Sequence, residues 1–126
     1  MTRISSHRIQ KLTGTLTVPG DKSISHRALI LGASAVGETV IYGLLEGEDV
    51  MTTAKALKYL GIEIKKNSNG SWSVIGRGVG GLSESSNVLD MGNTGTGMRL
   101  LLGLLASHPF NTIFTCLLYT SDAADE

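Results

Sequence analysis

Cysteine, proline and aromatic residues are scarce in this 126-residue chain, and the scarcity excludes several classes of protein. A single cysteine, Cys116, excludes an internal disulfide and a zinc site built from several cysteines. Aromatic residues make up 5%, and 11 Lys+Arg are balanced by 11 Asp+Glu, which is not typical of a nucleic-acid-binding protein. No apolar run is long enough to span a membrane, and the N-terminus shows no charged-then-apolar export signal. We therefore expect a cytoplasmic protein without a membrane partner.

Glycine is abundant, and the most informative glycine lies in the segment V-P-G-D-K-S-I-S-H-R, residues Val18–Arg27. A glycine turn leads into Lys22 and Ser23 at a predicted helix start, and Arg27 follows about one turn later. The first N–H groups of a helix have no intrahelical partner, and they attract anions together with the helix dipole. The segment therefore predicts an anion-binding site. Lys22 and Arg27 can reach one ligand only if Lys22 lies in the turn before the helix, and the preceding Pro19-Gly20 leads us to expect it there.

A second glycine-rich segment, G-N-T-G-T-G-M-R at Gly92–Arg99, also precedes a predicted helix and is the second candidate for anion binding. Two other glycine patterns are weaker. The stretch Gly14–Ser23 breaks the register of a P-loop because Asp21 stands before Lys22, and the glycines of 76–81 are followed by a loop where a dinucleotide-binding fold needs a helix.

The two candidate segments are partial copies of each other, 72 positions apart. Gly20 and Arg27 are separated by seven positions, as are Gly92 and Arg99, and an apolar run follows each arginine. Because repeated units bury their apolar faces against their neighbours, we expect about one and a half units here and an incomplete chain.

Hydrophobic periodicity and turn residues predict an α/β protein. Helices are expected at 23–35, 48–60 and 98–106, the last too apolar to be exposed and therefore buried on most sides. Strands are expected at 12–18, 39–42, 62–65, 71–75, 88–90 and from 112 onward.

The last residues, Cys116–Glu126, follow none of these patterns. Their sequence can be back-translated into a transposon-end adapter used in fragment-library sequencing. We therefore expect a non-native tail at 116–126 and exclude it from the fold.

Two segments carry a resemblance to a known family: P-G-D-K-S-I-S-H-R at Pro19–Arg27 and L-D-M-G-N-T-G-T-G-M-R-L at Leu89–Leu100. These segments and the spacing between them resemble the 5-enolpyruvylshikimate-3-phosphate (EPSP) synthase family, over Leu12–Thr115. The resemblance implies a parent enzyme of the shikimate pathway, which serves aromatic amino acid biosynthesis. That enzyme joins phosphoenolpyruvate to shikimate 3-phosphate by addition and elimination, releases phosphate, and needs no metal or other cofactor.

The family's fold, repeated βαβαββ units with pseudo-threefold symmetry, implies a domain arrangement. Residues 1–19 would form an N-terminal segment and crossover strand, and residues 20–115 would form the first part of one enolpyruvyl-transferase domain. The full-length parent would be a monomer, whereas this chain alone would be inactive.

The resemblance also implies roles for individual residues. Lys22 would be catalytic and contact phosphoenolpyruvate, Ser23 and Arg27 would bind the shikimate phosphate, and Asn93 and Gly95 would lie on the phosphoenolpyruvate side. Further possible site residues are Asp49, Thr96 and Arg99.

Other interpretations stay open. Asp49 is explained equally well as a helix cap, Arg27 as a surface ion pair, and Arg99 as an internal ion pair. His26 fits a hydrogen-bonded structural group better than a proton carrier, and His108 is expected at the surface. For the whole chain, the alternatives are a non-catalytic anion-binding module and the related UDP-N-acetylglucosamine enolpyruvyl transferases, which lack the K-S-I-S-H-R run.

Overall fold

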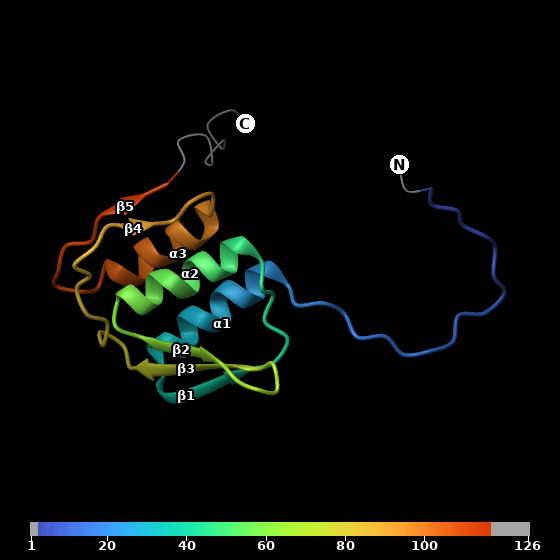
Figure 1. Cartoon of the computed structure of the whole chain (residues 1–126), viewed down its shortest axis with the longest axis horizontal. Coiled ribbons are helices and arrows are strands. Elements are labelled where there is room, and N and C mark those ends of the chain that lie inside the picture. The colour runs from blue at the N-terminus through green and yellow to red at the C-terminus, as the bar shows by residue number, and fades with distance from the viewer. Residues whose placement is uncertain (1–2, 117–126) are drawn as a thin grey trace.

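The computed structural model describes residues 3–116, so the predicted non-native tail lies outside the described residues except for Cys116. The order of elements confirms the predicted α/β class (Figure 1). The elements are α1 (Lys22–Ser34), β1 (Val36–Ile41), α2 (Glu48–Tyr59), β2 (Glu63–Lys66), β3 (Trp72–Arg77), β4 (Leu89–Asp90), α3 (Gly95–Leu105) and β5 (Phe114–Thr115).

Two small sheets are formed. In the first, the strand order is β1-β3-β2 and both pairs are antiparallel, with Val36 opposite Arg77 and Ile64 opposite Val74. The predicted hairpin is therefore present, and β1 begins at Val36, three residues earlier than expected. In the second sheet, β4 and β5 are parallel. Because α3 connects them, this part of the chain is a β-α-β unit.

The three helices follow one another away from the three-stranded sheet in the order α1, α2, α3, and their N-terminal ends lie at the same side of the molecule (Figure 1). Helix α1 packs on β3, α2 packs on α1, and α3 packs on α2. The core between these layers is aliphatic: Leu29, Val50, Leu57, Val74 and Leu101 are fully buried. The packing therefore places the three helix starts at the same side of the molecule (Figure 1).

Capping residues explain where the helices begin. Asp21 precedes α1, and its Oδ1 accepts a hydrogen bond of 2.8 Å from the N–H of Ile24. Glu48 and Asp49 lie in the first turn of α2, where the helix dipole favours carboxylates. Helix α3 begins three residues before the predicted start because the hydroxyl of Thr94 accepts the N–H of Gly97 at 3.1 Å.

Helix α3 is not buried on most sides, so that prediction is wrong. Within the helix only Gly97, Leu101 and Leu105 are buried, and Leu102 is 46% exposed. The physical reason is that α2 covers one face of α3 and leaves the opposite face open.

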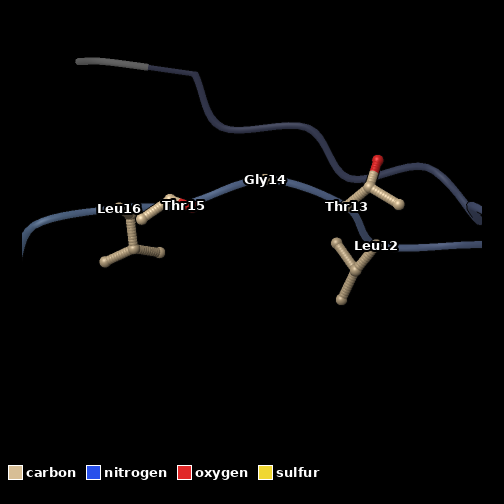
Figure 2. Close-up of a pocket in the computed structure, with 5 residues that line it drawn as sticks. All are labelled: Leu12, Thr13, Gly14, Thr15 and Leu16. Carbon is tan, nitrogen blue, oxygen red and sulfur yellow. The ribbon is translucent and has the colours of Figure 1, made fainter.

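The predicted strand at 12–18 is also absent from the structure. Leu12 is 86% exposed and Leu16 is 79% exposed. A hollow on this segment is lined by five consecutive residues, 12–16, whose side chains face no helix or strand in Figure 2. An alternating pattern produces a strand when another strand supplies backbone partners, and none of the described strands pairs with this one. The hollow is remote from the helix starts and is not a candidate site.

No helix within residues 3–116 combines the length and apolar character needed to cross a membrane.

Candidate anion-binding site

The candidate site is built on the first turns of α1 and α2. The Nζ of Lys22, the first residue of α1, forms an ion pair with Oδ2 of Asp49 in α2. The Lys22 side chain is 53% exposed and that of Asp49 is 26% exposed, so the pair lies at the surface of the junction. The expectation that Lys22 lies in the turn before the helix is wrong, because Asp21 takes the capping position.

The turn that leads into α1 is held tightly against the loop after β1. The hydroxyl of Ser25 accepts a hydrogen bond of 3.0 Å from the N–H of Leu45. A Cβ on Gly20 would overlap the carbonyl oxygen of Gly43 and lie 2.8 Å from the nitrogen of Leu45. Glycine is therefore required at position 20 for this close approach, and the approach fixes the direction in which α1 starts.

Arg27 and Ser23 are also brought together, at the exposed side of the same turn. The Arg27 guanidinium donates to the carbonyl oxygen of Ser23 at 3.1 Å. Neither Arg27 nor Arg99 forms an ion pair within residues 3–116, so the surface ion pair expected as an alternative for Arg27 and the internal one for Arg99 are not found there. Arg27 is exposed close to a helix N-terminus, where an anion would offset its unfavourable interaction with the dipole.

The start of α3 supplies backbone donors. The hydroxyl of Thr94 accepts a hydrogen bond from the N–H of Gly97. The N–H groups of Gly95 and Thr96, the first two of the helix, have no partner within the described residues. Asn93 is exposed beside them. The left-handed backbone in this turn is at Gly92, with φ of +51°, which no other residue type adopts as easily.

His26 is completely buried between α1 and α2, and its Nδ1 lies 2.9 Å from the hydroxyl oxygen of Thr53. This bond confirms the expectation that the side chain of His26 is hydrogen-bonded. Burial lowers the pKa of His26, as do the nearby charges of Lys22 and Arg27 to a smaller extent, while Asp49 acts in the opposite direction. The imidazole is therefore neutral at pH 7.

The lowered pKa of His26 predicts a pH dependence of stability. A group whose pKa is lower in the folded state stabilises the fold fully above its unfolded pKa of 6.5, and this contribution is lost as pH falls below that value. We expect the free energy of unfolding, measured in urea, to decrease from pH 7.5 to pH 5.5. In His26→Asn, which does not titrate there, the decrease should be smaller; equal slopes for both proteins would contradict the assignment.

One buried residue of the site region was missed from the sequence, and a second residue, beyond the C-terminal end of α3, was misjudged. Thr53 was not singled out, because no local pattern marks a helical threonine that bonds to another helix. His108, expected at the surface, is buried with 8% exposure. Its Nε2 lies 3.4 Å from the N–H of Leu82, and its ring packs against Phe110 with centroids 5.3 Å apart.

The side chains and free backbone groups of the candidate site are cationic or donate hydrogen bonds. Within residues 3–116, no three His, Cys, Asp or Glu side chains come together as a potential set of metal ligands. The ammonium of Lys22, the guanidinium of Arg27 and free N–H groups at helix starts are suited to phosphate and carboxylate groups, which form short, strong bonds with charged donors.

Comparisons with known proteins agree on one family. The family model for EPSP synthase (3-phosphoshikimate 1-carboxyvinyltransferase) matches residues 6–116. Among curated relatives, a 3-phosphoshikimate 1-carboxyvinyltransferase of Paramagnetospirillum magneticum is 61% identical over 112 residues, covering 89% of this chain and 25% of the relative. One of Ruegeria sp. is 57% identical over 112 residues, again covering 89% of this chain and 25% of the relative. A solved EPSP synthase from Acinetobacter baumannii superimposes with a TM-score of 0.77 at 44% identity, covering 83% of this chain and 24% of that one.

Proposed function

Because the chain belongs to the EPSP synthase family, we propose that the full-length protein transfers the enolpyruvyl group of phosphoenolpyruvate to shikimate 3-phosphate and releases phosphate. The chain spans about a quarter of the length of the curated relatives it matches, so the remaining groups of the site lie outside it. The observation that carries the proposal is that the three helices begin at the same side of the molecule, with Lys22 as the first residue of α1 (Figure 1). Both substrates carry phosphate and carboxylate groups, the ligands that such a site prefers.

Each residue has a proposed task at this site. Lys22 contacts phosphoenolpyruvate and stabilises the negative charge that moves onto the departing phosphate. Asn93 and Gly95 bind on the same side, where the free N–H of Gly95 is available to an anionic oxygen. Ser23 and Arg27 bind the phosphate of shikimate 3-phosphate, and Arg27 can do so with two parallel hydrogen bonds.

Three further residues are proposed at the edge of the site. Asp49 orients Lys22 through their ion pair. Thr96 offers a second free N–H beside Gly95, and the exposed guanidinium of Arg99 adds positive charge at the start of α3. In this arrangement Lys22 and the start of α3 act on phosphoenolpyruvate, whereas Ser23 and Arg27 act on shikimate 3-phosphate.

For the whole protein, we propose residues 1–19 as an N-terminal segment with the crossover to a second domain, and residues 20–115 as the first part of one domain. The protein acts as a cytoplasmic monomer on two small molecules, without a metal or other cofactor. The exposed apolar side chains of 12–18 support the first of these proposals, because a strand from elsewhere in the protein could cover them.

The proposal is tested by comparing the chain with a chimera in which residues 6–115, within the range that the family model matches, replace the corresponding segment of the Paramagnetospirillum magneticum relative. We expect the 126-residue chain alone to release no phosphate, because the reaction needs more cations and acid/base groups than this chain supplies. The chimera should release phosphate only when phosphoenolpyruvate and shikimate 3-phosphate are both present.

The other outcomes separate the alternatives. Phosphate release by the 126-residue chain alone would contradict the expected inactivity. A chimera that binds phosphoenolpyruvate without turnover would support a non-catalytic anion-binding module. Turnover with UDP-N-acetylglucosamine in place of shikimate 3-phosphate would assign the chain's segment to the related transferases.

A further inference from the structure

One buried oxygen atom lies where all three helices meet. The hydroxyl oxygen of Thr53, in α2, is 2.9 Å from Nδ1 of His26 in α1. A Cβ on Gly97, in α3, would overlap the same oxygen and lie 2.9 Å from the hydroxyl of Thr94. Thr53 and His26 are fully buried, and Gly97 is buried as well. The side chain of one threonine therefore contacts the two neighbouring helices.

This junction lies about one helical turn beyond the Lys22–Asp49 ion pair of the candidate site. His26 follows Lys22 by four residues in α1, and Thr53 follows Asp49 by four residues in α2. Residues four apart lie on one face of a helix. The Lys22–Asp49 ion pair and the His26–Thr53 hydrogen bond are thus successive cross-links between the same two helices, one exposed and one buried.

The junction is polar although it is buried. Burying a hydroxyl and an imidazole removes both from water, and Nε2 of His26 has no hydrogen-bond partner among the described residues. The neighbouring Thr52 bonds to the carbonyl oxygen of Glu48 within its own helix at 2.9 Å, as helical threonines commonly do, whereas Thr53 bonds to another helix. A directional bond defines the relative position of two helices more narrowly than apolar packing does.

We propose that the His26–Thr53 hydrogen bond, with Gly97 packed against it, is a positioning element of the anion site. It sets the placement of the three helix starts, and through them the placement of Lys22 and of the free N–H groups of α3. The inference rests on the proposed function, since it concerns the same site. His26 and Thr53 act through Lys22 and are positioning residues.

The test uses the chimera and a pair of substitutions at one position. Thr53→Val keeps the shape and removes the hydroxyl, and Thr53→Ser keeps the hydroxyl and removes the methyl group. We expect Thr53→Val to raise the Kd of phosphoenolpyruvate in calorimetry, and its KM, by about five- to tenfold, because a displaced Lys22 makes a weaker charge-assisted bond to the anion. Thr53→Ser should stay within about twofold of the unsubstituted chimera.

A control separates positioning from general destabilisation. Leu60→Val trims a fully buried side chain at the far end of α2, so it should lower the free energy of unfolding without changing the Kd of phosphoenolpyruvate. Equal Kd changes for Thr53→Val and Leu60→Val, or a Thr53→Ser variant as weak as Thr53→Val, would overturn the inference.

A second pair covers the case in which Thr53→Val does not fold. His26→Asn places an amide close to the position of Nδ1, and His26→Leu has no polar group there. The inference requires near-normal binding in His26→Asn and weakened binding in His26→Leu, and equal binding in both overturns it. A chimera that binds phosphoenolpyruvate without turnover contradicts the proposed function but not this inference. The Kd values of the variants can still be compared with that of the unsubstituted chimera, and their ratios decide the inference. No binding at all would overturn both.

Discussion

Replacing Lys22 with methionine in the chimera is expected to lower kcat/KM for phosphoenolpyruvate by about 10- to 100-fold. Methionine keeps most of the length of the side chain and removes the charge. A hydrogen bond from a charged group to an anion contributes about 1.5–3 kcal/mol, and the loss appears in the transition state as well as in binding. Steady-state phosphate release at varied phosphoenolpyruvate measures it.

Lys65→Met is the matched control for this prediction. Lys65 lies in β2, where it points to the opposite face of the strand from the buried Ile64 that packs into the core, and its side chain is 57% exposed compared with 53% for Lys22. It should leave kcat/KM unchanged. Equal losses in the two variants would mean that general charge, rather than the position of Lys22, attracts the substrate.

Gly76→Ala is expected to destabilise the fold by about 3 kcal/mol, the upper range for overpacking a core. A Cβ at this position in β3 would overlap the carbonyl oxygens of Gly32 and Ala35, at the end of α1, and lie 3.0 Å from the carbonyl carbon of Ala35. These are backbone atoms, and the Ala35 oxygen also accepts the N–H of Gly78 at 2.8 Å. The helix and the strand would have to separate, which urea unfolding of the chimera would detect.

Gly103→Ala serves as the opposite case. Gly103 lies within α3, and a Cβ there would meet nothing within 4 Å. Alanine is favoured over glycine inside a helix by about 1 kcal/mol, so this substitution should stabilise the chimera. If both glycine substitutions destabilised the protein similarly, the close approach of α1 to β3 would not be the cause at Gly76.

Local signals in the sequence were sufficient for most of the fold. Asp21 and the acidic pair in the first turn of α2 marked the helix starts, and Asn69-Gly70 marked the hairpin between β2 and β3. The repeated glycine and arginine positions pointed to α1 and α3 as equivalent elements. Of the candidate site, the sequence predicted which residues lie at the helix starts, because capping and glycine turns are local.

Long-range features could not be predicted in the same way. The bond between His26 and Thr53 joins residues 27 positions apart, and nothing near either residue distinguishes it from an ordinary helical side chain. His108 is buried for a similar reason, since its partner Leu82 is 26 positions away. The strand expected at 12–18 does not form. An alternating apolar pattern predicts which face of a strand would be buried, but it does not supply a second strand to pair with.

The ion pair between Lys22 and Asp49 has a consequence for how ligands enter. Before any ligand arrives, a carboxylate of the protein already occupies one side of the lysine ammonium. Binding of an anion at Lys22 is then an exchange of one negative partner for another. Each new contact with Lys22 is partly offset by a weakened contact with Asp49, so added salt competes with both states. The affinity should therefore fall less steeply with ionic strength than for a lysine that starts unpaired.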